Sequence, residues 1–209
     1  MVHRVPFFLP WIYPDLIWRF PTAEKEIYLT FDDGPVPGPT DFVLETLRKY
    51  NCKATFFCIG DNVRKHPEVF KKILKEDHVI GNHTFNHLKG WSTPLTRYVE
   101  NVKQFDKQVK LESEDLKIEL FRPPYGRITR SQIRSLKDYK IVMWDVLTID
   151  YNKNISPDAC FKNSVAATRP GSIVVFHDSI KAERNMMYAL PRFIEHFQEQ
   201  GYAFKSIST

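Results

Sequence analysis

The sequence contains few cysteines and few glycines, and each shortage argues against a class of protein. The three cysteines, Cys52, Cys58 and Cys160, show no Cys-x-x-Cys or Cys/His spacing, so they indicate neither a disulfide framework nor a thiolate metal site. We expect them to be small buried hydrophobic residues. The eight glycines form no glycine-rich phosphate-binding loop. No apolar run is long enough for a membrane-spanning helix.

The N-terminal segment, residues 1–25, is apolar but is interrupted by Pro6, Pro10 and Pro14. It lacks the continuous apolar stretch and the small-residue cleavage site of a signal peptide, which predicts a cytoplasmic protein. We expect this segment to pack on the domain formed by residues 26–209. The alternative is peripheral contact with a membrane surface through its large aromatic side chains, Phe7, Phe8, Trp11 and Trp18.

The net charge of +5 at pH 7 does not by itself indicate a nucleic-acid partner. Lysines and arginines are scattered along the chain, and no RNA-binding aromatic signature is present. We therefore expect a solvated basic surface and no nucleic-acid partner. With 209 residues, 43% of them hydrophobic, the chain is long enough to bury one core, and we expect a single domain.

Apolar runs and helical spacing alternate from residue 26 onward. The runs predict strands at 27–31, 53–59, 78–81, 118–121, 140–146, 172–176 and 203–207. Helices are predicted at 39–50, 67–74, 95–109, 130–136, 157–167 and 187–200. This alternation is typical of an α/β fold with a parallel sheet, either open or closed as a barrel.

Polar residues stand at or just after the ends of several predicted strands: Asp32, Asp33, His83, Arg122, Asp150 and His177. In a barrel the carboxyl ends of the strands converge on one face, whereas an open sheet would spread these residues along a line. We therefore prefer a barrel.

The strand at 27–31 ends on two adjacent carboxylates, Asp32 and Asp33, followed by Gly34 and Pro35. Two acids this close raise one another's pKa unless a cation neutralises one of them and a donor holds the other. An Asx turn is the alternative interpretation, but it explains only one of the two aspartates.

His83 and His87 are four residues apart, a spacing that places both imidazoles on one face of a helical turn. Together with a strand-end aspartate they would give three protein ligands and an open position, which is the arrangement of a catalytic zinc-type site. His66 and His78 have no such context, and we expect them at the surface.

Arg122 follows a predicted strand and precedes the stiff turn Pro123-Pro124-Tyr125. Its guanidinium could hydrogen-bond one of the two aspartates, and the turn could aim the Tyr125 amide at a developing oxyanion. A loop ion pair is the alternative. His177 ends the most apolar strand, and a carboxylate from Asp150 would set its tautomer and pKa.

Four motifs resemble those of the polysaccharide deacetylases with a NodB-homology domain, carbohydrate esterase family 4. They are Thr30-Phe31-Asp32-Asp33-Gly34, the H-[ST]-x-x-H run from His83 to His87, Arg122-Pro123-Pro124-Tyr125, and Val175-Phe176-His177. The resemblance implies a deformed (β/α)7 barrel that binds a divalent metal ion, with zinc expected ahead of other divalent metals. It further implies the following roles: Asp33, His83 and His87 as metal ligands, Asp32 as base, Tyr125 as oxyanion donor, His177 as acid, Arg122 as the partner of Asp32 and Asp150 as the partner of His177.

The sequence departs from the family in two motifs. The fourth, usually D-x-x-D-W, is Leu147-Thr148-Ile149-Asp150-Tyr151 here, and the last begins with Val175 in place of leucine. Tyr151 and Val175 stand where the acetyl methyl is expected to pack, so both bear on the choice of substrate. Sugar rings could stack on aromatic residues near the catalytic segments: Phe85, Trp91, Tyr125 and Tyr151.

The resemblance implies hydrolysis of N-acetyl groups on the amino sugars of a chitooligosaccharide- or peptidoglycan-like glycan. The alternatives on the same scaffold are hydrolysis of other non-peptide C–N bonds, hydrolysis of O-acetyl esters, and glycan binding by a pseudoenzyme. The combination of Asp32, Asp33, His83, His87 and His177 argues against the pseudoenzyme, because a binding module needs no base, acid and open metal site together.

Overall fold

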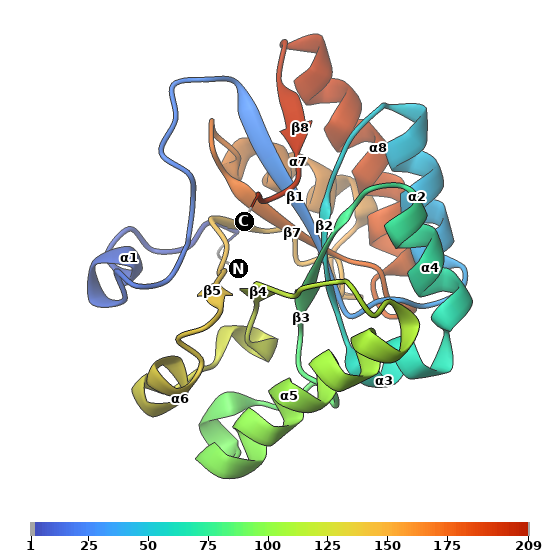
Figure 1. Ribbon diagram of the computed structural model, residues 1–209. Coiled ribbons are helices and arrows are strands. Elements are labelled where there is room, and N and C mark those ends of the chain that lie inside the picture. The colour runs from blue at the N-terminus through green and yellow to red at the C-terminus, as the bar shows by residue number, and fades with distance from the viewer. Residues whose placement is uncertain (1–2, 209) are drawn as a thin grey trace.

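The computed structural model describes residues 3–208. Its centre is a curled sheet of parallel strands in the order β5-β4-β3-β2-β1-β7-β6, and β8 pairs with the first half of β1 (Figure 1). The strands are β1 (Glu26–Asp32), β2 (Thr55–Cys58), β3 (Val79–Asn82), β4 (Leu120–Phe121), β5 (Lys140–Ile141), β6 (Val146–Leu147), β7 (Ile173–His177) and β8 (Ala203–Lys205). The predicted deformed (β/α)7 barrel is confirmed, as a curled half-barrel.

The prediction of one strand over residues 140–146 is wrong, because the chain leaves the sheet after β5 and enters it again at β6. Between them, the Met143 N–H donates to the Ile17 carbonyl, 2.7 Å away. The Asp145 carboxylate turns to Arg169 and Ser172, at 3.0 and 2.7 Å. These contacts replace the strand ladder with a bend.

The helices are α1 (Leu9–Ile12), α2 (Pro39–Lys49), α3 (Gly60–Lys65), α4 (Pro67–Lys75), α5 (Leu95–Glu112), α6 (Arg130–Ser135), α7 (Pro157–Ala167) and α8 (Glu183–Glu199). Proline at the first helical position starts α2, α4 and α7, where its missing N–H has no intrahelical partner to lose. The last helix begins four residues before the predicted Met187, and the six-residue α3 was not predicted. Helix α3 is too short to show an apolar period.

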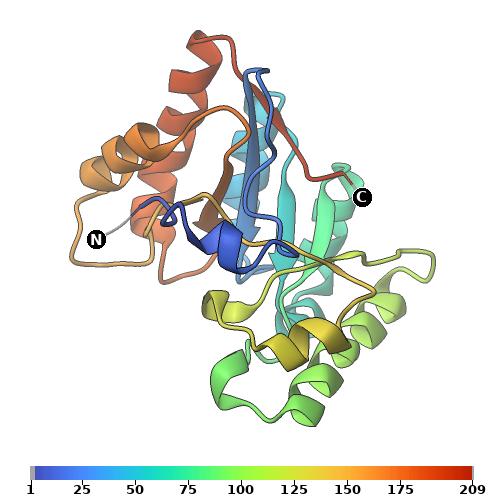
Figure 2. The same ribbon diagram turned by 90° about the vertical axis from the view of Figure 1, so that its left-hand side faces the viewer.

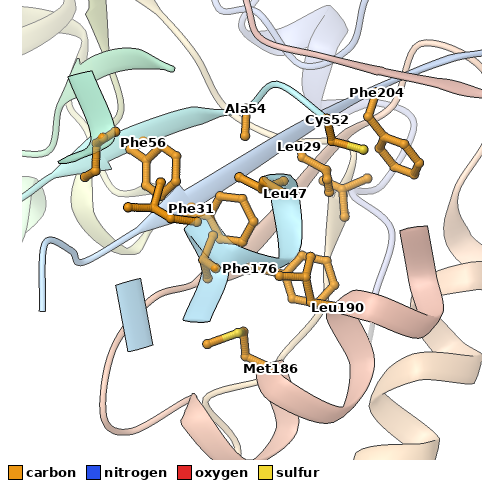
Figure 3. Close-up of a cluster of buried hydrophobic side chains, with 14 of the residues drawn as sticks. Leu29, Phe31, Leu47, Cys52, Ala54, Phe56, Phe176, Met186, Leu190 and Phe204 are labelled. Carbon is orange, nitrogen blue, oxygen red and sulfur yellow. The ribbon is translucent and has the colours of Figure 1, made fainter. Parts of the chain in front are cut away.

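The largest part of the core lies between the sheet and the helices on its outer face (Figure 3). Successive side chains of a strand point to opposite faces, so Leu29 and Phe31 of β1 point toward these helices. The Phe31 ring stacks on Phe56 of β2 at 5.1 Å and on Phe176 of β7 at 6.2 Å. Because side chains alternate along the strand, Thr30 and Asp32 of β1 point to the opposite, inner face.

The three cysteines are buried and free, as expected.

The N-terminal segment lies against the open side of the curled sheet, with α1 in front of the strands (Figure 2). Backbone bridges join Arg4 to Val146, Ile17 to Val142 and Arg19 to Ser172. The segment thus contacts strands from both edges of the sheet.

The prediction that Trp18 could contact a membrane surface is wrong, because Trp18 is only 9% exposed and its indole N–H donates to the Tyr13 carbonyl. Phe7 and Trp11 are exposed. Within residues 3–208, no helix combines the length and the apolar composition needed to span a bilayer.

Candidate active site

The carboxyl ends of the strands surround a cavity of about 970 Å³. Its lining includes residues at or just after the ends of three strands: Asp32 at the end of β1 and Asp33 after it, His83 and His87 after β3, and His177 at the end of β7. Residues that are up to 145 positions apart in the chain thus share one space, as the barrel argument predicted.

Asp32 is buried and its carboxylate is held by Arg122. Arg122 Nη1 donates to Asp32 Oδ1 and to Thr30 Oγ1, both at 2.7 Å. Burial alone would raise the pKa of Asp32, but the nearby Arg122 guanidinium, with His83 and His177, lowers it below its usual range. Asp32 is therefore an oriented carboxylate that is ionised at neutral pH.

Arg122 is itself fixed on every side. Its Nε donates to the Val142 carbonyl at 3.2 Å and its Nη2 donates to the Met143 carbonyl at 2.9 Å. The guanidinium carbon lies 4.0 Å from the centre of the Phe57 ring, which covers one face of the group. The side chain is fully buried, so the pair with Asp32 is an internal ion pair and not a loop contact.

Asp33, His83 and His87 each direct one ligand atom to a common point, and these atoms all lie within 4.8 Å of one another. Asp33 Oδ1 is 3.2 Å from His87 Nε2 and 3.9 Å from His83 Nε2. Asp33 has a φ of 83°, which is unusual for a residue other than glycine. The reversed backbone lets both neighbouring carboxylates line the cavity.

The protonation of the two histidines suits them to bind a metal. His83 Nδ1 lies 2.8 Å from the Arg122 carbonyl, so Nδ1 carries the proton and the Nε2 lone pair points to Asp33. Burial lowers the pKa of His83 to about 4 and also lowers the pKa of His87. Both rings are then neutral at pH 7. Two neutral imidazoles and one carboxylate are the donor set of a catalytic divalent-metal site, so the residues fit such an ion.

His177 faces this group from the neighbouring strand, since it aligns with Asp32 in the register of β1 and β7. Asp150 accepts two hydrogen bonds from it, one from the backbone N–H and one from Nδ1, both at 2.7 Å. Burial alone would lower the pKa of His177, but the Asp150 carboxylate raises it to about 9. His177 is therefore protonated at neutral pH.

Tyr125 lies in a rigid turn beside the ligand group. Its φ is 61° and the next residue, Gly126, has a φ of 64°. A Cβ on Gly126 would lie 2.5 Å from the Trp144 ring, so both the backbone angle and the space require glycine. The Tyr125 ring is 4.7 Å from the His87 ring and is 60% exposed.

The remaining predicted substrate residues are placed differently from one another. Tyr151 lines the cavity and packs edge-on against His177 at 5.0 Å. Val175 is fully buried in β7 and Phe85 is buried, and neither is among the residues that line the cavity. Trp91 is exposed and lies just beyond the lining.

A sequence profile described as polysaccharide deacetylase matches residues 20–144, more than half of the chain. The chain belongs to the polysaccharide deacetylase family. A relative in this family, the peptidoglycan-N-acetylglucosamine deacetylase of Bacillus cereus, is 36% identical in an alignment 198 residues long, which covers 91% of this chain and 90% of the relative. The resemblance drawn from the four motifs is confirmed.

Solved structures of polysaccharide deacetylases share the fold. The Bc1960 peptidoglycan N-acetylglucosamine deacetylase matches with a TM-score of 0.89 at 30% identity, over 97% of this chain and 95% of that one. BA3943 of Bacillus anthracis, described as a family pseudoenzyme, matches with a TM-score of 0.83 at 26% identity, over 91% of this chain and 66% of that one. The fold is thus shared by a deacetylase and by a protein described as a pseudoenzyme, so the fold alone does not show activity.

Several residues that support this polysaccharide deacetylase site were missed. The Asp178 carboxylate is buried and accepts from the Gly34 N–H at 3.0 Å and from Thr40 Oγ1 at 2.6 Å. It follows His177 directly, which was the available signal. Asn62 donates to the Asp33 carbonyl at 2.7 Å from within α3, where nothing in the sequence marks it. The expectation that His78 lies at the surface is wrong, because it is 7% exposed and its Nδ1 accepts from the Ala54 N–H.

Proposed function

We propose that this protein hydrolyses N-acetyl groups on the amino sugars of a glycan, with the help of a divalent metal. The observation that carries the proposal is the pairing of two opposite protonation states across one cavity. Asp32 is held as an ionised carboxylate by Arg122, and His177 is held as an imidazolium by Asp150. Separated base and acid functions are what amide hydrolysis requires.

Asp33, His83 and His87 would hold the metal, which we propose to be zinc because imidazole and carboxylate donors with an open position suit it. A bound divalent ion supplies Lewis acidity, which polarises the acetyl carbonyl and lowers the pKa of water. The Arg122 carbonyl keeps His83 in the tautomer that leaves Nε2 free for this task.

Asp32 takes the proton from the attacking water. Arg122 donates to Asp32 Oδ1 and to Thr30 Oγ1, so the Asp32 carboxylate is held in one orientation and its other oxygen is available for this proton. The fixed guanidinium keeps the carboxylate from rotating away, so the base does not need to be ordered during the reaction.

His177 gives a proton to the amine nitrogen as the C–N bond breaks. An unprotonated amine is a poor leaving group, so an imidazolium at this position lowers the barrier to cleavage. Since Nδ1 is bonded to Asp150, the proton leaves from Nε2. We propose that the Tyr125 backbone N–H stabilises the oxyanion, in keeping with its fixed turn beside His87.

The amino sugar would lie among the aromatic side chains of the cavity, Tyr125, Trp144 and Tyr151. Val175 would act on the acetyl group only indirectly, because it is fully buried and is not among the residues that line the cavity. Trp91 would contact a sugar beyond the reacting one.

Acetate release from N-acetylglucosamine oligomers and from peptidoglycan fragments tests the proposal. We expect release from the purified protein, loss on treatment with a chelator, and recovery on addition of zinc. Binding of these glycans without acetate release under any metal condition would establish the pseudoenzyme alternative. Release from O-acetylated xylan and not from N-acetylated glycans would establish an esterase.

The cytoplasmic location expected from the sequence stays a prediction. Cell fractionation that finds the protein mainly outside the cytoplasm would overturn it.

A further inference from the structure

Three cations stand on the rim of the cavity: Lys89, Arg127 and Lys181. In the described part of the chain, no carboxylate lies within 4.0 Å of any of their charged nitrogens. The described residues lining the cavity include only two acids, Asp32 and Asp33, and both belong to the catalytic floor. The rim therefore carries positive charge that no group of the protein neutralises at close range.

The three cations lie on both sides of the reacting centre. Arg127 follows β4 and Lys89 follows β3, whereas Lys181 follows β7. Asp32 is at the end of β1, which lies between β2 and β7 in the sheet. A glycan whose reacting sugar lies over Asp32 would thus meet a cation on each side.

Two of the cations are held by aromatic rings. The Arg127 guanidinium lies 4.7 Å from the centre of the Trp91 ring, and the Lys181 ammonium lies 5.2 Å from the centre of the Tyr151 ring. The Trp91 indole N–H donates to the Ile128 carbonyl at 3.1 Å, which fixes the ring under Arg127. Each ring limits where its cation can go and leaves its polar hydrogens free for a ligand.

The catalytic floor does not offset this charge. Arg122 and His177 balance two of the three carboxylates Asp32, Asp33 and Asp150, and a divalent ion would more than balance the third. With the metal bound, the whole cavity attracts anions.

We propose that the rim binds carboxylates carried by the sugars on either side of the reacting N-acetylglucosamine. This inference rests on the proposed function and narrows its substrate to a glycan in which N-acetylglucosamine alternates with an acid-bearing sugar. Arg127 and Lys181 are then specificity-determining residues. The carboxylate has two possible sources, the lactyl ether of muramic acid or a peptide joined to it, and the rim would recognise the same group in both.

The test compares one glycan in two forms. A peptide-free tetrasaccharide of alternating N-acetylglucosamine and N-acetylmuramic acid is assayed with its lactyl carboxylates free, and again with each converted to a neutral methylamide. The readout is the ratio of kcat/KM for the two forms, because a general loss of activity affects both alike. A third form, with peptides on the lactyl groups, separates the two sources of carboxylate.

We expect the parent to favour a carboxylate-bearing form about tenfold, mainly through KM. Solvent-exposed ion pairs contribute up to about 1 kcal/mol each, so Arg127→Gln and Lys181→Gln should each reduce the ratio about two- to fivefold. The double variant should bring it near one. Lys103→Gln, an equal charge change on the exposed face of α5, should leave the ratio as in the parent.

A parent ratio near one for both carboxylate forms, or a ratio that the double variant does not change, would overturn the inference and leave the proposed function standing. If no form releases acetate, the proposed function is contradicted. Equilibrium binding titrations of the protein with the same glycan forms then test separately whether the rim binds carboxylates. Tighter binding of a carboxylate form that Arg127→Gln and Lys181→Gln weaken would support the inference, and equal dissociation constants would overturn it.

Discussion

The pairing of His177 with Asp150 sets the pH range in which His177, the proposed acid of the reaction, is protonated. Asp150 holds both the ring and the backbone of His177, and it raises the pKa of the imidazolium to about 9. The protonated form therefore persists through neutral pH and is lost as the pH rises through about 9. The stabilisation of the fold by this pair follows the same course, being complete below the ordinary histidine pKa of about 6.5.

Asp150→Asn should move the alkaline limb of the kcat/KM profile to lower pH by about two units. The carboxylate that raises the pKa of His177 most is lost, whereas the burial that lowers it and the weaker effect of Asp33 and Asp32 remain, so the pKa falls toward its ordinary value. Initial rates of acetate release between about pH 5 and 10 measure the shift. An alkaline limb that stays in place would contradict the role of Asp150, provided the metal content is that of the parent.

Asp178 holds the turn that carries Asp33, one of the proposed metal ligands. Its carboxyl group accepts hydrogen bonds from Gly34 and Thr40, at both ends of that turn. A Cβ on Gly34 would lie 1.9 Å from Asp178 Oδ2, which shows how closely the two segments approach. Burial raises the pKa of Asp178 to about 8, so the group is mostly neutral at pH 7.

Asp178→Ala should weaken metal binding about 10- to 100-fold, the usual effect of removing a residue that orients a ligand. Competition with a chelator measures the dissociation constant. Asp178→Asn keeps an oxygen for the Gly34 N–H and matches the neutral charge, so it should bind metal more tightly than the alanine variant. Asp158→Ala, which removes an acid paired with Lys162 at the surface, is the control. Equal affinity in Asp178→Ala and the parent would show that the turn holds without Asp178.

At the scale of elements, α8 covers the central strands through Phe193. This ring is fully buried and lies 5.7 Å from Phe176 of β7, 4.9 Å from Phe197 and 6.2 Å from Phe204 of β8. One side chain therefore joins α8 to two strands.

Phe193→Ala should lower the free energy of unfolding by about 3–5 kcal/mol, from lost burial and the cavity left behind. Urea denaturation followed by circular dichroism measures the change. Leu111→Ala on the exposed side of α5 should change it by less than about 0.5 kcal/mol. A comparable loss in both variants would mean that α8 is not fixed to the sheet by this contact.

The regular elements of the sheet were predictable because their apolar runs are buried, whereas the bend at residues 142–145 was not. Residues 140–146 are as apolar as a strand, but the chain bends where the N-terminal segment bonds to Met143 and where Asp145 turns to Arg169. Both partners are distant in the sequence, so no local pattern indicates them. The start of α8 could not be predicted either, because residues 183–186 hardly extend the helical spacing of apolar residues that predicts the rest of the helix.

The convergence of the strand-end residues on one cavity was predictable because parallel strands place their carboxyl ends together. The contacts that hold these residues in place could be predicted only in part. Thr30 could have been found from strand alternation, since it lies two residues before Asp32 on the same face. Asn62 and Asn185 could not, because a polar residue on a helix carries no sign of the carbonyl it will reach.

At the scale of the whole molecule, the proposed mechanism gives different tasks to two neighbouring aspartates, Asp32 at the end of β1 and Asp33 directly after it. Asp32 is paired with Arg122 and its other oxygen lies 4.0 Å from His83 Nε2, whereas Asp33 lies 3.9 Å from His83 Nε2 and 3.2 Å from His87 Nε2. Asp32→Asn keeps the size of the side chain but cannot accept a proton, so it should keep its metal and lose rate by about 10²–10⁴-fold. Asp33→Asn replaces a negative ligand with a neutral one and should lose metal first.

Titration of both variants with zinc in one acetate-release assay, with metal content measured on the same samples, tests this division most directly. We predict that excess zinc restores part of the activity of Asp33→Asn and none of that of Asp32→Asn. Rescue of Asp32→Asn alone, or near-parental activity in both variants without added metal, would contradict the account.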